Sequence, residues 1–353
     1  MIEILSSGAV NSVQDLGRFG YLDAGVGRSG AMDAPALEVA NLMVGNPGGF
    51  AGLEISLFPF RLKFLAPTVF AITGADCPAS LSGKSLPPWW TIQAAEGDVL
   101  ELGLPRSDAR ACLAFAGGID VADLLGSKST DLKSGWGGHE GRGLKRGDRL
   151  SLGETTAHRP LPPGGFGLDP LEFRPAPAAP AVAIPVRVLP SAESAAFSQE
   201  ARSEFFAVAW RVSAEANRQG YRLEGPELHP STRLELFSHG IMPGTVQVPP
   251  SGQPIIQLAE ANTCGGYPKI ANVIEADLWR LGQTPSGSAI RFIAVDRPQA
   301  IAALRSQRSA IARAAAFAAL VRKDKVEPGL YTGLQMVRPA RGGNAMQINH
   351  KGE

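Results

Sequence analysis

Glycine and proline are so frequent in this chain that long, uninterrupted helices cannot dominate its fold. The 353 residues include 41 glycines and 28 prolines. Glycine readily adopts the backbone angles that end regular elements, and proline removes a hydrogen-bond donor. Such a turn-rich chain favours many short β-strands. The length is sufficient for two domains, each with its own hydrophobic core.

The clearest internal boundary is a segment rich in proline, alanine and glycine at residues 157–185. Its composition favours extended, semi-rigid conformations and prevents a continuous helix. We therefore predict an N-terminal β domain over residues 1–156 and a C-terminal β domain over residues 186–297, joined by this linker. A C-terminal helix and tail follow at residues 298–353, and residues 335–353 show little apolar periodicity.

Both predicted domains contain sequence that is typical of strands. A turn followed by alternating apolar and polar residues begins at Gly97, at Gly147 and again at Gly287. Further strands are predicted over residues 61–65 and 110–115. These patterns indicate barrel-like sheets in both halves.

Only three helices are predicted. Asp33 can cap a helix over residues 34–44, and a short helix is expected over residues 275–281. Pro298 can open a longer, alanine-rich helix that continues to about Arg322.

Charge and composition exclude several classes of partner. The formal net charge of +1 predicts no binding to nucleic acid or to an acidic membrane surface. No apolar run approaches the ~18 residues that cross a bilayer, and the first residues do not have the pattern of a signal peptide. The three cysteines form no Cys-x-x-Cys pair and are typical of reduced thiols. We expect a cytoplasmic protein.

Residues 265–269, Gly-Gly-Tyr-Pro-Lys, present a single lysine on a glycine-hinged turn. Gly265 and Gly266 allow backbone N–H groups to approach a ligand closely, and Pro268 fixes the backbone just before Lys269. This arrangement is typical of a place that holds something small and polar. An ordinary β-turn with a solvated lysine is the alternative.

A similar concentration of polar residues among glycines occurs near the N-terminus. The residues concerned are Gln14, Asp15, Arg18, Arg28, Ser29, Met32 and Asp33. Loops that carry such side chains are natural binding surfaces. Alternatively, Asp15 and Arg18 pair with each other and Asp33 serves only as a helix cap.

Residues 217–225 combine two guanidinium groups, an amide and a carboxylate with two glycines. The guanidinium group of Arg218 suits carboxylate or phosphate binding. Asn217, Arg222 and Glu224 are further candidates, although Arg222 and Glu224 share one strand face and can simply pair with each other.

Two further candidates lie at or near strand ends. Asp76 follows an apolar strand and is placed to contact a ligand, although a turn-forming aspartate is the alternative. Gln247 lies on a turn-bounded strand and can act as a ligand amide or face solvent. The histidines are scattered without metal-ligand spacing, and no nucleophile elbow is present, so we expect neither a metal nor a serine triad.

Taken together, these segments resemble the biotin-dependent carboxyltransferase family, also called allophanate hydrolase subunit 2 or urea amidolyase-related. The resemblance runs in order over residues 2–296. Its segments are Ser12–Arg18, Ser29–Asp33, Ala40–Pro47, Leu53–Glu54, Thr73–Asp76, Ala116–Val121, Leu125–Leu132, Asn217–Gly220, Arg222–Gly225 and Gly265–Lys269. Two positions depart from the family pattern, because Ala216 and Gln219 stand where serine and methionine are usual. They indicate an altered pocket or a different substrate.

The resemblance implies a mainly β fold with two cyclophilin-like β-barrel domains, a few short helices and a C-terminal helix. It also implies two candidate chemistries. Free-standing members are similar to the C-type subunit of a 5-oxoprolinase, which opens 5-oxoproline to glutamate with ATP, together with a B-type sister subunit of related fold and a lactam-handling A-type subunit. Other members move a carboxyl group from carboxybiotin to urea. A non-catalytic regulatory protein that binds the sister subunit or a kinase-like partner is the third possibility.

Both chemistries must polarise a poorly reactive amide or ureido group, which needs fixed donors near the developing negative charge. The resemblance therefore implies catalytic roles for Lys269, Arg218 and Asp76, which we expect to border one groove with partly exposed side chains. The implied substrate-binding residues are Gln14, Asp15, Arg18, Ser29, Met32, Asn217, Arg222, Glu224, Gln247, Gly265, Gly266 and Tyr267. The chain carries no biotin-attachment motif, so we expect one component of a larger assembly.

Overall fold

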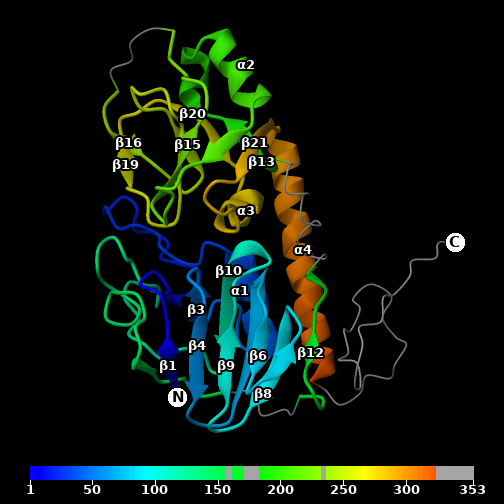
Figure 1. Ribbon diagram of the computed structural model, residues 1–353. Helices are drawn as coiled ribbons and strands as arrows, with labels where there is room; N and C mark the ends of the chain where they lie inside the picture. Colours follow the sequence, from blue (N-terminus) through cyan, green and yellow to red (C-terminus); the bar gives the residue numbers. More distant parts are fainter. Residues whose placement is uncertain (156–160, 171–182, 232–235, 323–353) are drawn as a thin grey trace, which may run out of the picture.

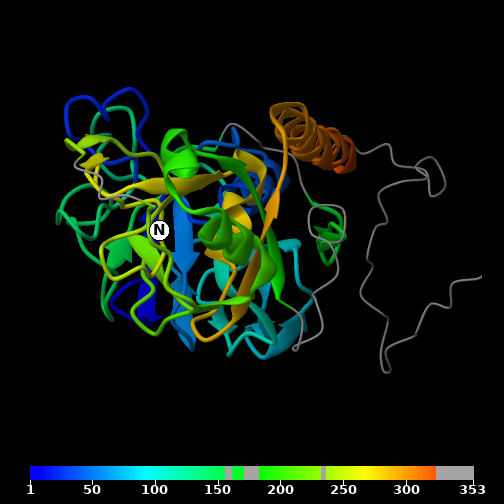
Figure 2. The ribbon, with the colours of Figure 1, turned by 90° about the horizontal axis from the view of Figure 1, so that it is seen from above.

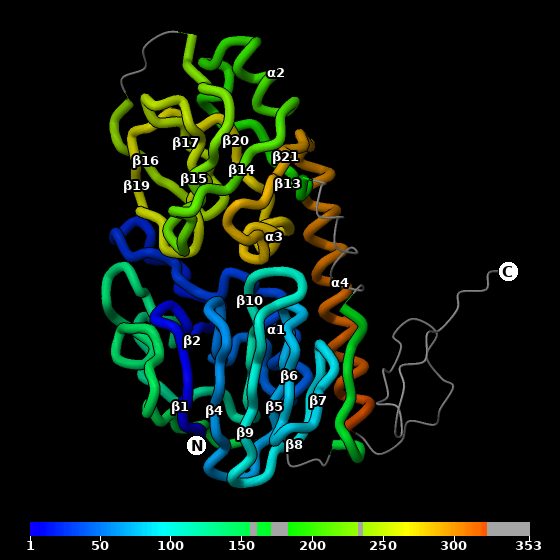
Figure 3. Tube along the Cα trace, viewed as in Figure 1, coloured from blue at the N-terminus to red at the C-terminus, as the bar shows by residue number. Residues whose placement is uncertain are grey.

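Two β units stacked end to end form the molecule, and a long helix runs along one side of both (Figure 1). The computed structural model describes residues 1–155, 161–170, 183–231 and 236–322. The predicted tail beyond residue 322 and most of the predicted linker lie outside the described residues. The path of the chain can be followed in Figure 3.

The N-terminal unit consists of two six-stranded antiparallel sheets. The first contains, in spatial order, β11 (Arg149–Leu150), β1 (Ile2–Ser6), β4 (Phe60–Phe64), β9 (Val99–Leu102), β6 (Ala79–Leu81) and β7 (Lys84–Leu86). The second contains β12 (Phe166–Gly167), β8 (Trp90–Ala94), β5 (Thr68–Asp76), β10 (Ser107–Phe115), β3 (Gly52–Ile55) and β2 (Ser12–Gln14). Alternating apolar residues of both sheets, such as Leu62 and Phe70, form one buried core.

Helix α1 (Ala34–Val44) packs on the second of these sheets. The Asp33 side chain caps it by accepting a hydrogen bond from the Ala36 N–H at 3.0 Å, and Gly45 ends it in the left-handed conformation with a φ of 87°. Both ends are those that the sequence predicts.

The C-terminal unit is a closed seven-stranded barrel. Its spatial order is β13 (Ile184–Pro190), β20 (Lys269–Val273), β17 (Thr245–Gln247), β18 (Ile255–Gln257), β15 (Gly220–Glu224), β14 (Trp210–Val212) and β21 (Ala289–Ala294). β13 and β21 are parallel, and the other neighbouring pairs are antiparallel. A separate two-stranded sheet joins β16 (His239–Gly240) to β19 (Cys264–Gly265).

Within its described residues, the C-terminal unit also contains four short helical elements. They are η2 (Ala192–Ala196), α2 (Gln199–Ala207), η3 (Glu275–Asp277) and α3 (Leu278–Gly282). The last two confirm the helix predicted over residues 275–281. Helix α2 is not predicted from the sequence because it is short and mostly polar. Its one clear signal is the Ser198 cap, whose side chain accepts a hydrogen bond from the Ala201 N–H at 3.1 Å.

Helix α4 (Arg297–Val321) returns from the barrel to the first unit (Figure 1), and the view from above shows it at the outer edge of the molecule (Figure 2). A capping box between Asp296 and Gln299 stabilises its first turn. The helix begins at Arg297, one residue before the predicted start at Pro298. Its buried residues pack with α1 and the second sheet, and Phe317 meets Phe166 edge to face at 6.1 Å. Phe166 belongs to the predicted linker, so part of that segment completes the first unit.

The mainly β fold with barrel architecture and a C-terminal helix is thus confirmed. The turns at Gly97, Gly147 and Gly287 lead directly into β9, β11 and β21. Among the described residues, none of the helices is long and apolar enough to pass through a bilayer.

Replacing Phe317 with alanine tests how strongly α4 is docked. Phe317 is 5% exposed, so Phe317→Ala should lower the free energy of unfolding by about 3–5 kcal/mol through lost burial and a cavity. Urea denaturation measures this change. The matched control is Phe237→Ala, because Phe237 is 96% exposed and its loss should cost less than about 0.5 kcal/mol. Equal effects of the two substitutions would contradict the docking of α4.

Candidate functional site

A buried ion-pair network joins the two units, and Arg218 is its centre. The guanidinium Nε donates to Glu260 Oε1 at 2.6 Å, Nη2 donates to the Gly30 carbonyl at 2.6 Å, and Nη1 donates to Glu54 of the first unit. Arg218, Glu54 and Glu260 are 7%, 2% and 3% exposed. The expectation that Arg218 is partly exposed is therefore wrong. Each of the three guanidinium nitrogens donates a hydrogen bond to a group inside the protein.

The same network fixes the loop that precedes α1. Glu54 Oε2 accepts a hydrogen bond from the Met32 N–H at 2.6 Å. Arg110 forms an ion pair with the same carboxylate, with its Nε 3.7 Å from Glu54 Oε1. Arg110 Nη1 also donates to Tyr221 Oη of the barrel at 3.2 Å. Burial alone would lower the pKa of Arg110, but Tyr221 and Glu54 hold that pKa above its ordinary value, so Arg110 stays charged.

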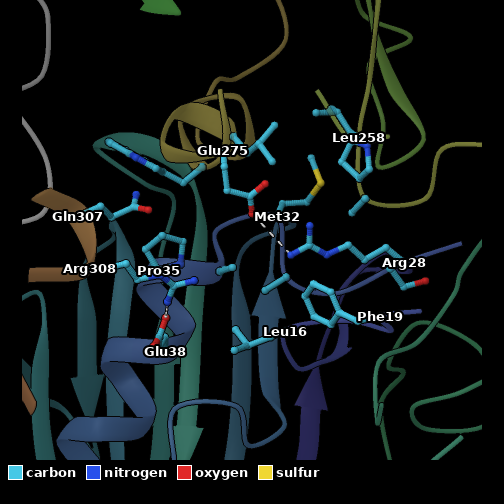
Figure 4. A pocket seen from close by; sticks show the side chains of 17 residues that line it. Leu16, Phe19, Arg28, Met32, Pro35, Glu38, Leu258, Glu275, Gln307 and Arg308 are labelled. Carbon is cyan, nitrogen blue, oxygen red and sulfur yellow. Dashed lines mark hydrogen bonds and ion pairs between the residues drawn. The ribbon is translucent and has the colours of Figure 1, made fainter. Parts of the chain in front are cut away.

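An open pocket of about 110 Å³ lies where this loop, the barrel and α4 meet (Figure 4). Its apolar wall is formed mainly by Leu16, Phe19, Met32, Pro35, Leu258, Leu278 and Trp279. Its polar lining consists of Arg28, Ser29, Glu38, Glu275, Gln307 and Arg308. Two predicted substrate-binding residues, Ser29 and Met32, therefore line a pocket between the two units.

Lys269 lies elsewhere, at the first residue of β20. Its Nζ contacts the His239 ring and donates to the Gly265 carbonyl at 3.4 Å. Lys269 is only 5% exposed. His239 Nε2 in turn lies 3.1 Å from Glu193 Oε1. Burial lowers the pKa of the Lys269 ammonium from its ordinary value, and the Glu193 carboxylate opposes that shift.

Gln247 accompanies Lys269, because the two residues are register partners on β17 and β20. Its Oε1 accepts a hydrogen bond from Gln257 Nε2 at 2.9 Å, whereas its Nε2 is buried and has no partner among the described residues. Gly265 lies so close to this amide that a Cβ there would be 2.8 Å from Nε2. Gly266 and the half-exposed Tyr267 complete the turn between Gly265 and Lys269.

Sequence reasoning missed two members of this cluster, His239 and Glu193. They are 46 residues apart in the chain, and neither lies in a recognisable motif. Only the approach of β16 and η2 to the start of β20 brings them to Lys269. The arrangement presents a desolvated amine and an unpaired amide donor, which can act together on a carbonyl or carboxyl oxygen.

The loop around residues 127–130 is held in place by Gln14, Asp15 and Arg18. Asp15 accepts hydrogen bonds from the hydroxyls of Ser127 and Ser129 at 2.7 and 2.5 Å. Arg18 donates to the Ser129 carbonyl at 2.5 Å, and Gln14 Nε2 donates to the Thr130 carbonyl at 3.1 Å. All three side chains thus form hydrogen bonds with residues 127–130. Within the described residues, Asp15 and Arg18 form no direct ion pair.

Asn217, Arg222 and Glu224 are exposed on the hairpin that carries Arg218. Asn217 Oδ1 accepts a hydrogen bond from the Gln219 N–H at 2.8 Å, which shapes the turn. Arg222 pairs with Glu215 at 2.9 Å and Glu224 pairs with Arg211 at 3.9 Å. The alternative of a mutual pair between Arg222 and Glu224 does not hold, because each pairs with another residue.

Asp76 ends β5 and lies 3.9 Å from Arg106. No hydrogen bond or ion pair within the described parts of the chain joins any two of Asp76, Arg218 and Lys269. Lys269 is also buried, contrary to the expectation of partial exposure. Strand β20 extends four residues beyond Lys269, roughly 13 Å, before the chain reaches the interdomain pocket. The common groove for these three residues stays a prediction.

Comparison with known proteins identifies the family. The family model described as carboxyltransferase domain, subdomain A and B, matches residues 24–294. The chain belongs to this carboxyltransferase family. This confirms the resemblance that the sequence motifs indicate.

Relatives within the family have two kinds of name. The 5-oxoprolinase C subunit of Escherichia coli is 40% identical over 308 residues, which cover 87% of this chain and 96% of that protein. Urea amidolyase of Lachancea kluyveri is 35% identical over 88% of this chain but only 18% of its own length. The crystal structure of Kluyveromyces lactis urea carboxylase superposes with a TM-score of 0.80 at 30% identity, over 89% of this chain and 29% of that one.

Removing Arg218 should destabilise the protein strongly. Arg218→Ala leaves Glu260 buried without its counter-charge and leaves Glu54 with Arg110 alone, so the free energy of unfolding should fall by about 3–5 kcal/mol. Arg222→Ala is the matched control, since this arginine is 58% exposed and its ion pair should contribute less than about 1 kcal/mol. Urea denaturation compares the two variants. An Arg218→Ala variant as stable as Arg222→Ala would contradict the role of the network.

Proposed function

We propose that this chain is the C-type subunit of an ATP-dependent 5-oxoprolinase, which opens the lactam ring of 5-oxoproline to glutamate. The observation that carries the proposal is the match to the 5-oxoprolinase C subunit over 96% of that protein's length. ATP enters through the complex, whose other members are a B-like sister protein of related fold and an A-like lactam-handling protein. The complex acts in the cytoplasm.

Lys269 is the proposed electrophilic residue. It meets a carbonyl, carboxyl or phosphoryl oxygen that carries developing negative charge, with the unpaired Nε2 of Gln247 as a second donor. A donor in a desolvated setting acts more strongly than the same donor in water. Arg218 takes a positioning role in this proposal, because its buried guanidinium group is held by Glu54, Glu260 and the Gly30 carbonyl. Asp76 is retained as a further candidate.

Carboxyl transfer is the second candidate function. The family description and the likeness to K. lactis urea carboxylase favour it. In that case a separate carrier protein supplies carboxybiotin, and the Lys269 cluster faces the carboxyl group or an acceptor related to urea. Reconstitution with a biotin carrier and biotin carboxylase, followed by transfer of labelled bicarbonate to urea, distinguishes this function from lactam opening.

Substitution of Lys269 should impair the reconstituted complex. Lys269→Ala should lower turnover by one to several orders of magnitude, as the loss of one positioned charge donor does, while the far-UV circular dichroism stays unchanged. The measurement is ATP-dependent formation of glutamate from 5-oxoproline. Lys84→Ala, at an exposed lysine of β7, is the control and should leave turnover unchanged. Wild-type turnover in Lys269→Ala would refute the assignment.

The isolated chain should be inactive. With ATP, a divalent metal and 5-oxoproline it should form no glutamate, and activity should appear only when the B-like and A-like proteins are added. Co-expression of the three proteins and a coupled glutamate assay test this. Robust activity of the chain alone would show that its site is complete and would remove the need for partners.

A further inference from the structure

The pocket between the two units has features of a ligand site that the Lys269 cluster does not share. It is bordered by the loop before α1, by the end of the barrel that faces the first unit, and by α4. Figure 4 shows Arg28 and Met32 side by side at the pocket, with Phe19 beneath the arginine. Ligand sites commonly lie at such domain interfaces.

Arg28 is held in place by stacking and by one ion pair, which leave most of its N–H groups unused. Its guanidinium group stacks on the Phe19 ring at 4.2 Å and lies 3.6 Å from Glu275. Among the described residues it makes no side-chain hydrogen bond. Glu275 is 49% exposed, so solvent screens this ion pair. A planar guanidinium group fixed by stacking, with unused N–H groups, suits a carboxylate.

Ser29 adds an independent indication of a ligand. Its side chain is 3% exposed, and its Oγ is buried without a hydrogen-bond partner in the described structure. Its backbone has a φ of 53°, a conformation that residues other than glycine rarely adopt. Buried hydroxyls are normally paired, and strained residues gather at functional sites.

The backbone around both residues is anchored from two sides. The Ser29 N–H donates to the Ala259 carbonyl of the barrel at 2.9 Å, and the Arg28 carbonyl accepts from the Arg18 N–H at 2.7 Å. Arg218 holds the following carbonyl, that of Gly30. The polar groups are therefore positioned before any ligand arrives, which reduces the entropy lost on binding.

We propose that this pocket binds a small monocarboxylic acid with a compact apolar body. The carboxylate is held by Arg28 and Ser29, and the body packs on Met32, Leu258 and Trp279. The second acidic side chain of the pocket, Glu38, does not compete for Arg28, because it is already paired with Arg308 at 2.8 Å.

Methyl-labelled methionine gives a direct readout of binding to the isolated chain. Met32 lines the pocket, whereas Met43 is fully buried in α1 and serves as the internal control. Three probes are titrated while the methyl resonances are followed. They are cyclopentanecarboxylate, its neutral isostere cyclopentanecarboxamide, and 5-oxoproline. The two acids should shift Met32 in a saturable manner without shifting Met43, and the carboxamide should bind at least about tenfold more weakly.

Comparison of the two acids separates two sources of the ligand. Tighter binding of 5-oxoproline shows that the pocket also recognises a lactam and takes a substrate-like acid. Equal or weaker binding of 5-oxoproline than of cyclopentanecarboxylate shows that it takes an apolar acid. Either result supports the proposal and leaves the activity of the reconstituted complex as a separate question.

Two substitutions and a control localise the effect. Arg28→Gln should weaken binding of both acids by about tenfold or more, and Ser29→Gly by about threefold or more. Glycine suits the backbone of residue 29, so the second variant removes the hydroxyl without strain. Arg211→Gln, at an exposed arginine of the barrel, should change binding by less than about twofold. The absence of a Met32 shift, equal shifts with acid and carboxamide, or unchanged binding in Arg28→Gln would overturn the proposal.

Discussion

The buried ion-pair network around Arg218 is the constraint on which the arrangement of the molecule depends. One guanidinium group joins Glu54 of the first unit to Glu260 of the second and also holds the carbonyl of Gly30. These charges are acceptable inside the protein only because each is paired and hydrogen-bonded. The network therefore fixes the two units in one orientation, since any other would leave a buried charge without a partner.

The same network fixes the backbone of the loop that lines the interdomain pocket. Glu54 and Arg218 hold the backbone of Met32 and Gly30, and this anchoring directly after Ser29 helps to keep Ser29 in a strained conformation. Helix α4 then covers one side of the pocket with Gln307 and Arg308. The pocket and the Lys269 cluster are two separate places, one between the units and one at the far end of the barrel strand β20.

The sequence predicts several site residues but not which residues surround them. The glycine-hinged turn at Lys269 and the strand that carries Gln247 do meet, because β17 and β20 are neighbours in the barrel. The arginine motif indicates that Arg218 suits a carboxylate, and the carboxylates that it contacts in the structure are those of Glu54 and Glu260. Such a motif alone does not reveal whether a carboxylate from another domain will reach the arginine. His239 and Glu193 could not be found from local patterns, because their relation to Lys269 exists only after the chain has folded.

What the sequence determines by itself is local: the turns that open β9, β11 and β21, the Asp33 cap and Gly45 end of α1, the alanine-rich helix after Pro298, and the family motifs. Each follows from backbone preferences of a few adjacent residues. The tertiary structure alone decides that Arg218 is buried, that Phe166 joins the first unit and that Arg28 and Ser29 line a pocket between the units. These outcomes depend on burial and on the pairing of charges far apart in the chain, and neither is encoded in any single segment.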